Sequence, residues 1–224
     1  MNFDKALHST RVVTPQGIKD ATVFIKNGKI ADVLEGSIPA GIAGVEDLGD
    51  AVVMPGLIDA HVHINEPGRS DWEGFETATR AAAAGGVTTL IEMPLNASPV
   101  TTTVAALEQK IAAAEGKLHV YCGFYGGLVP QNIGDLPDLL RAGVFGIKCF
   151  LTHSGIDEFP NVSAEEVAQA MRIIEPTGLP LLAHAELDAP HSKLAFFQKN
   201  PTLYQAFLKS RPKTWENRAI ELLL

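Results

Sequence analysis

The chain has 224 residues, with 18 Lys and Arg against 26 Asp and Glu, so its formal net charge is −8 with neutral histidine. This negative charge argues against nucleic acid or an anionic membrane as a partner. There are two cysteines, no run of about 18 apolar residues and no apolar signal segment near the start, which together favour a cytoplasmic enzyme or ligand-binding protein.

Residues 1–52 are predicted to form a small β module. Runs rich in β-branched residues at 10–14 and 21–25 precede a third strand at 29–34. Asn27-Gly28, between the last two runs, is a strong signal for a tight hairpin. No helical period occurs in this segment.

Residues 53–224 read as apolar strands alternating with helices, which favours a parallel α/β sheet. We predict helix starts at two capping boxes, residues 70–73 and 163–166. The strands are expected at residues 52–63, 87–93, 118–124, 144–151 and 181–184, and the helices at 70–84, 101–115, 135–142, 163–177 and 212–224. Five such strands fit either an incomplete (β/α)8 TIM-type barrel, about three strands short, or a complete open sheet.

The first candidate site residues end the first long strand of this region. Asp59, His61 and His63 are spaced by two, so a strand places their side chains on one face. Two imidazoles spaced in this way on a strand can bind one metal ion. Their position, where the strand passes into a loop, is typical of active sites in parallel α/β enzymes. The alternative is that one of the histidines is a buried structural residue.

Lys148 is the only charged residue of the strand at 144–151. A buried ammonium is costly, so this lysine must pair, lose its proton or be modified. A neutral lysine amine can take up carbon dioxide to form a carbamate, whereas a salt bridge or a side chain reaching solvent is the alternative. His184 and Glu186 end the strand at 181–184 with the same spacing of two, and a carboxylate beside a histidine is common around metal ligands.

These motifs together resemble the amidohydrolase superfamily in its cyclic-amidase branch. The resemblance is carried by residues 55–63, by residues 146–150 and by His184, and it extends over the whole chain. Residues 65–75 and 93–99 are similar to the allantoinases of that branch. The resemblance implies a barrel fold for residues 53–224, and it implies that residues 1–52 are the N-terminal part of a small β-sandwich.

The resemblance also implies roles for particular residues. His61 and His63 would bind one of two divalent metal ions, the carbamate of Lys148 would bridge both ions, and His184 would bind the second. Zinc is the expected metal, and manganese, cobalt and iron are alternatives. Asp59, Asn65, Asn96 and Glu186 would contact substrate or the metal ligands. A further histidine and the catalytic aspartate of the family are expected beyond Leu224, so we expect the 224 residues alone to be inactive.

The activity implied is metal-dependent hydrolysis of a cyclic amide, with allantoin opened to allantoate in purine and ureide catabolism. The substrate would be a small cyclic ureide, and we expect a homo-oligomer, dimer or tetramer. Dihydroorotases of the branch carry an arginine where this chain has Asn65, which favours a neutral substrate here. A hydantoinase or dihydropyrimidinase, a dihydroorotase-like enzyme and a non-catalytic assembly subunit are the alternatives.

Overall fold

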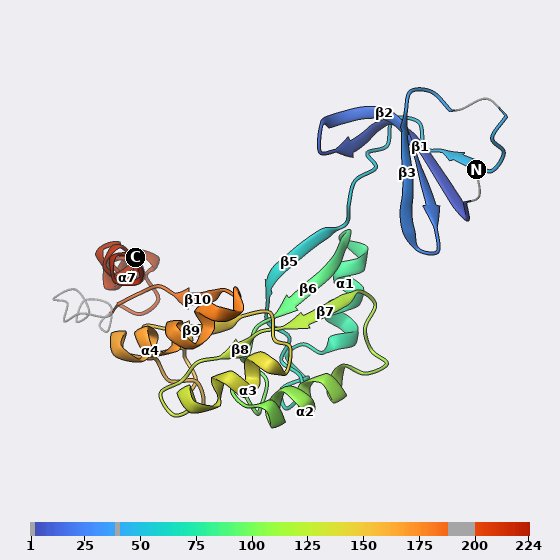
Figure 1. Ribbon diagram of the computed structural model, residues 1–224. Coiled ribbons are helices and arrows are strands. Elements are labelled where there is room, and N and C mark those ends of the chain that lie inside the picture. Colours follow the sequence, from blue (N-terminus) through green and yellow to red (C-terminus); the bar gives the residue numbers. More distant parts are fainter. Residues whose placement is uncertain (1–2, 39–40, 188–199) are drawn as a thin grey trace. The chain divides into compact units, whose positions relative to one another are not determined.

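A computed structural model describes residues 3–38, 41–187 and 200–224 (Figure 1). The chain divides into two compact units, Met1–Gly56 and Leu57–Leu224. The first unit is a β-sheet and the second alternates strands with helices, so the predicted mixed α/β class is confirmed. None of the helices in the described ranges has the length and apolar character needed to cross a membrane.

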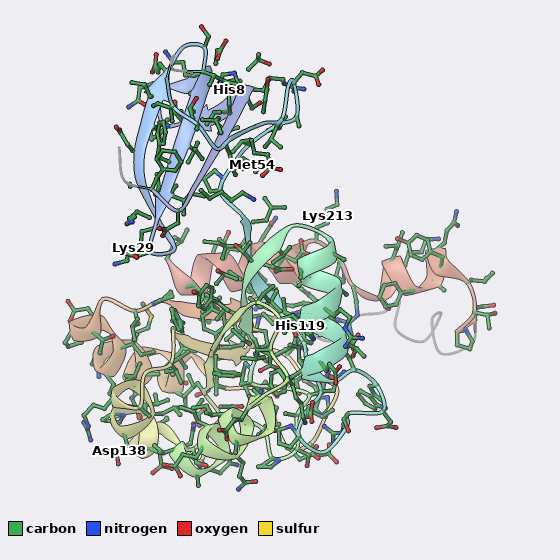
Figure 2. The ribbon with its side chains drawn as sticks, turned by 90° about the vertical axis from the view of Figure 1, so that its right-hand side faces the viewer. His8, Lys29, Met54, His119, Asp138 and Lys213 are labelled. Carbon is green, nitrogen blue, oxygen red and sulfur yellow. The ribbon has the colours of Figure 1, made fainter. Side chains whose placement is uncertain are left out.

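The first unit is a four-stranded sheet in the order β3-β2-β1-β4. Its strands are β1 (Lys5–Thr14), β2 (Gly17–Lys26), β3 (Lys29–Glu35) and β4 (Val45–Asp47). The predicted hairpin is confirmed: Asn27 and Gly28 have φ of 51° and 71°, a left-handed pair that matches the twist of β2 and β3. His8 is buried in this sheet, with Nδ1 3.1 Å from the Thr22 hydroxyl (Figure 2).

The second unit contains two three-stranded sheets, ordered β5-β6-β7 and β10-β9-β8, and both are parallel. The strands are β5 (Leu57–Val62), β6 (Val87–Glu92), β7 (Tyr121–Phe124), β8 (Gly126–Gly127), β9 (Ile147–Phe150) and β10 (Leu181–His184). The sequence predicts five of them, whereas β8 consists of two glycines, which have low strand propensity. Parallel pairing brings the carboxyl ends of neighbouring strands to the same edge of a sheet.

Helices connect these strands (Figure 1). The α-helices are α1 (Phe75–Ala84), α2 (Val104–Ala114), α3 (Leu136–Arg141), α4 (Ala164–Ile174), α6 (Tyr204–Ser210) and α7 (Thr214–Leu223), with short 3-10 turns at Ile133–Asp135 and Glu175–Thr177. The largest apolar cluster packs α3 and α4 against β9, through residues such as Leu139, Ile147 and Val167. β9 lies between β8 and β10, and all four of its residues are buried.

The two predicted capping boxes have different outcomes. The box at Ser163 and Glu166 is confirmed, because each side chain accepts a hydrogen bond from the other's backbone N–H and α4 begins there. The box at residues 70–73 is wrong: these residues form a turn, and α1 begins only at Phe75. Its cap comes from the loop after β5, where Glu66 accepts a hydrogen bond from the Phe75 N–H at 2.9 Å. Glu66 also forms an ion pair with Lys117.

We therefore predict that Glu66→Ala lowers the free energy of unfolding by about 1–2 kcal/mol, because the first turn of α1 loses its acceptor and Lys117 loses its partner. Ser70→Ala serves as the control, since Ser70 is exposed and caps nothing, and should change stability by less than about 0.5 kcal/mol. Urea denaturation of both variants measures this. A larger loss for Ser70→Ala than for Glu66→Ala would contradict the assignment of the cap.

Candidate metal centre

The end of β5 presents the first two candidate ligands. β5 ends at Val62, so His61 lies within the strand and His63 immediately after it. Their ring centroids are 5.4 Å apart with the planes tilted by 51°, so the two imidazoles lie side by side. The Asp59 carboxylate is engaged by the backbone, because its Oδ1 accepts the His61 N–H at 3.0 Å. Asp59 thus braces the strand that carries the pair.

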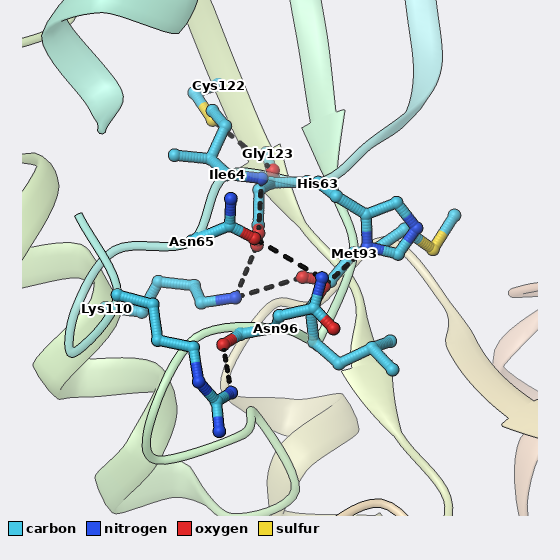
Figure 3. A network of polar contacts seen from close by, with 11 residues as sticks. His63, Ile64, Asn65, Met93, Asn96, Lys110, Cys122 and Gly123 are labelled. Atoms are coloured by element: carbon cyan, nitrogen blue, oxygen red, sulfur yellow. Dashed lines mark hydrogen bonds and ion pairs between the residues drawn. The ribbon is translucent and has the colours of Figure 1, made fainter. Parts of the chain in front are cut away.

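His63 is held in one orientation. Its Nδ1 donates to the Leu95 carbonyl at 2.6 Å (Figure 3), which leaves Nε2 as the lone-pair nitrogen. A histidine that donates one ring nitrogen to a carbonyl is oriented as metal-ligating histidines are. Burial lowers the pKa of His63, the Leu95 hydrogen bond raises it, and the nearby Lys148 charge lowers it again. The net lowering favours the neutral imidazole, which is the form that binds a metal.

Lys148 has the environment that its sequence context predicts. Its residue surface is 4% exposed, because β9 is the central strand of its sheet. Among the described residues no carboxylate or hydrogen-bond acceptor pairs with its Nζ, which lies 5.0 Å from the centroid of the Phe150 ring. Burial lowers the pKa of the Lys148 amine, so the neutral form is favoured at a lower pH than for an exposed lysine. The salt-bridge alternative has no partner in the described chain.

His184 ends β10 beside this lysine strand. Its ring stacks on Phe150 with centroids 4.9 Å apart and an angle of 13° between the planes. Nε2 of His184 lies 3.3 Å from Oε2 of Glu186, and Arg211 donates to the same oxygen at 2.7 Å. The predicted pairing of His184 with Glu186 is therefore present. The sequence did not indicate Arg211, which follows α6 and holds the Glu186 carboxylate.

Three of the four candidate ligands line one pocket of the second unit, and His63 is not among its lining residues. A cavity of about 520 Å³ is lined by His61, Lys148 and His184, together with Glu186 and residues of the segment 207–220. Burial is the main cause that lowers the pKa of His61, followed by the charges of Lys148 and His63, while Asp59 raises it and His184 lowers it slightly. The other three candidate ligands therefore all contribute to the lowered pKa of His61.

The histidines do not form a metal site by themselves. Within the described ranges, no group of three or more His, Cys, Asp and Glu side chains is arranged to hold a metal ion. A site here would need Lys148 as an additional ligand, and an amine can serve as an anionic oxygen ligand only after conversion to a carbamate. The buried, unpaired and pKa-lowered Lys148 fits that requirement, so the residues present are compatible with the group.

Two loops beyond the strand ends are fastened to each other. Asn65, which is 7% exposed, accepts a hydrogen bond from the Asn96 side chain at 3.3 Å. Arg69 donates to the Asn96 carbonyl at 2.6 Å and to Glu158 at 2.9 Å, so it ties the loops after β5 and β6 to the loop after β9. Both predicted asparagines thus contribute to loop structure.

Sequence reasoning missed a second charged pair near the site. Glu92, the last residue of β6, and Lys110, on α2, form an ion pair, and both are fully buried. A single acidic residue at the end of an apolar strand, such as Glu92, can be noticed in the sequence. The sequence spacing between Glu92 and Lys110 gives no indication that the two residues pair. His119, by contrast, lies beside α1 (Figure 2), where its N–H donates to Thr79, away from the candidate ligands.

Comparisons with known proteins identify the class. Residues 52–208 match the model of the amidohydrolase family. The chain belongs to the amidohydrolase family. Members of this family typically depend on metal ions.

The similarity extends along the whole chain. It is 52% identical to the allantoinase of Streptomyces avermitilis over 100% of this chain and 50% of that protein. It is 42% identical to the allantoinase of Saccharomyces cerevisiae over 98% of this chain and 50% of that protein. The solved L-hydantoinase (dihydropyrimidinase) from Arthrobacter aurescens superimposes with a TM-score of 0.88 at 32% identity, covering 99% of this chain and 50% of that one. The chain spans about half the length of the curated relatives it matches.

The lowered pKa of His63 predicts a pH dependence of stability. Unfolding returns His63 to an ordinary pKa near 6.5, so below about pH 6.5 the unfolded state binds more protons than the folded state. The free energy of unfolding should therefore fall as the pH falls through this range, because the unfolded imidazole takes up protons that the folded one does not.

Urea denaturation of the metal-free protein from about pH 8 to about pH 5 measures the slope. His63→Asn, whose amide can still donate to Leu95, should make the slope shallower, whereas Ser70→Ala, which changes no titratable group at an exposed position, should leave it unchanged. An identical slope in His63→Asn and the unmodified protein would refute the prediction.

Proposed function

We propose that this chain is part of an allantoinase, in which it contributes most of a two-metal centre for opening the ring of allantoin to allantoate. The observation that carries the substrate assignment is the identity of 52% to a protein named allantoinase along the entire chain. The L-hydantoinase that superimposes well is only 32% identical. Relatives named allantoinase from yeast and Arabidopsis thaliana are also more similar, at 42% and 43%.

In this proposal His61 and His63 would hold one divalent ion, His184 would hold a second, and Lys148, as its carbamate, would supply oxygen ligands to both. The neutral Lys148 amine would add to carbon dioxide and release one proton to solvent, which would create an N–C bond and a carbamate whose single negative charge is shared by two oxygen ligands. Zinc is the proposed metal, with manganese, cobalt and iron as alternatives. Metal ions bound here would lower the pKa of water and polarise a ring carbonyl.

The residues of this chain would prepare the site for that chemistry. Leu95 keeps His63 in the tautomer with a free Nε2, and Glu186, held by Arg211, orients His184. The burial of Lys148 favours the neutral amine, which is the form that reacts with carbon dioxide. Asn65 and Asn96 shape the loops on the side from which a neutral ureide would approach. Proton transfer to the leaving nitrogen would be the task of the family's aspartate, expected outside these 224 residues.

A hydantoinase or dihydropyrimidinase is the second candidate, favoured by the TM-score of 0.88 to the Arthrobacter aurescens enzyme. A dihydroorotase-like activity is disfavoured by Asn65 in the place of an arginine. A non-catalytic assembly subunit is disfavoured by the presence of all four candidate ligands. We further propose a homo-oligomer, a dimer or tetramer, in the cytoplasm; the bullfrog (Aquarana catesbeiana) relative, 46% identical, is named a mitochondrial allantoinase.

Substrate competition tests the proposed activity. The complete translated protein containing these residues, loaded with zinc, is supplied with allantoin, hydantoin and dihydroorotate, and ring opening of each is followed. We expect kcat/KM for allantoin to exceed that for the other two by at least about tenfold, a difference of about 1.4 kcal/mol in transition-state binding. A preference for hydantoin would establish the second candidate instead, and a metal-free, inactive protein would support an assembly subunit.

Replacing Lys148 tests the bridging ligand. Lys148→Ala removes the only group proposed to bind both ions, so we expect the metal content, measured by elemental analysis, to fall from about two ions per chain to one or fewer. In parallel, ¹³C NMR after incubation with ¹³C-bicarbonate should show a carbamate signal that is absent in the variant. Lys213→Ala is the matched control, because Lys213 lines the same pocket but is exposed (Figure 2). Unchanged metal content in Lys148→Ala would refute the carbamate role.

A further inference from the structure

The ion pair between Glu92 and Lys110 lies in the core of the second unit, and neither residue has exposed surface. Burial raises the pKa of the Glu92 carboxyl and lowers that of the Lys110 amine, because each charge is removed from water. A buried pair of this kind is often no more stabilising than two apolar side chains of similar volume. Stability alone therefore does not account for it.

Each member of the pair also holds one backbone group beside His63. Oε1 of Glu92 accepts the N–H of Ile64 at 3.1 Å, and Ile64 directly follows His63. Nζ of Lys110 donates to the carbonyl of Met93 at 3.0 Å, at the start of the turn that leads to Leu95. Figure 3 shows the Lys110 side chain extended toward this junction, between the chain after β5 and the chain after β6.

The two backbone groups lie on the two sides of the hydrogen bond that orients His63. The segment with Ile64 carries the imidazole, and the segment with Met93 carries the Leu95 carbonyl that accepts from Nδ1 at 2.6 Å. A backbone hydrogen bond from the Met93 N–H to the Val62 carbonyl, 2.7 Å long, joins the segments just before they separate. Beyond that point Glu92 joins the segments through the Ile64 N–H and Lys110 holds the Met93 carbonyl, while the Asn65–Asn96 and Arg69–Asn96 hydrogen bonds join them farther along.

We propose that Glu92 and Lys110 are positioning residues for His63: together they set the distance between its ring and the Leu95 carbonyl, and so keep Nε2 free for a cation. This inference rests on the proposed metal centre. Apolar residues at the two positions would fill the same volume, but they could neither accept from Ile64 nor donate to Met93. Replacing the pair by apolar residues should therefore weaken metal binding while leaving the stability of the fold nearly unchanged.

The test compares two double variants. Glu92→Leu with Lys110→Met removes both charges and both backbone bonds, whereas Glu92→Gln with Lys110→Met removes the charges but retains an acceptor for the Ile64 N–H. We expect both to unfold at temperatures close to that of the unmodified protein. Zinc affinity, measured by competition with a chromophoric chelator, should fall about tenfold in the first variant and less in the second.

A second readout does not depend on metal. ¹⁵N NMR of metal-free protein labelled at histidine should show His63 protonated at Nδ1 in the unmodified protein, and a mixture of tautomers in the Leu/Met variant. The control is Glu76→Gln with Arg80→Met, which removes an exposed ion pair on α1 and should change neither readout.

The outcomes separate the two proposals. An unmodified protein that binds no zinc overturns the metal centre, and the tautomer measurement still decides the positioning role. If the Leu/Met variant retains both the zinc affinity and the single tautomer, the pair is merely structural and the inference is wrong. Should that variant fail to fold, the Gln/Met variant decides: unchanged values for both readouts overturn the inference, and weaker zinc binding with mixed tautomers supports it.

Discussion

The desolvation of one amine determines how the centre of this protein can work. Lys148 lies on β9, the middle strand of a parallel sheet. This strand pairs with β8 on one side and β10 on the other, and all four of its residues are buried. An ammonium group in that position, with no carboxylate partner for it among the described residues, is unfavourable, so the neutral amine is favoured. The same burial that destabilises the charge makes the nitrogen nucleophilic. The burial that makes a charged Lys148 unfavourable thus also makes its amine able to react with carbon dioxide.

The histidines depend on the backbone that surrounds them. His63 obtains its orientation from the Leu95 carbonyl, and His184 obtains its orientation from Glu186 and from the Phe150 ring on which it stacks. Leu95 lies in the loop after the strand next to His63, and Phe150 lies on the strand next to His184. Glu186 follows His184 in the chain. The centre is thus built from neighbouring strand ends, and its precision depends on how the loops beyond those ends are joined. Arg69 joins three of these loops.

Local patterns in the sequence predicted features that depend on neighbours along the chain. The hairpin at Asn27-Gly28 needs only two residues that tolerate positive φ, and the helix start at Ser163 needs only an acidic residue three positions later. The same capping pattern failed at Ser70, because Glu66 reaches the Phe75 N–H across the loop and the chain turns before the helix begins. A competing acceptor nine residues away is invisible to a local pattern.

The sequence by itself determined the mixed α/β class, the family and the candidate ligands His61, His63, Lys148 and His184, because strand periodicity and a lone lysine in an apolar strand are properties of short segments. Only the tertiary structure decided which groups surround those ligands. It paired Glu92 with Lys110, turned Asp59 toward the backbone, and brought Arg211 to Glu186. Glu92 and Lys110, like Arg211 and Glu186, are distant in the chain, and the local pattern around Asp59 does not distinguish a side chain that binds the backbone from one that faces a ligand. The formation of these contacts depends on the packing of helices against strands, which no short segment encodes.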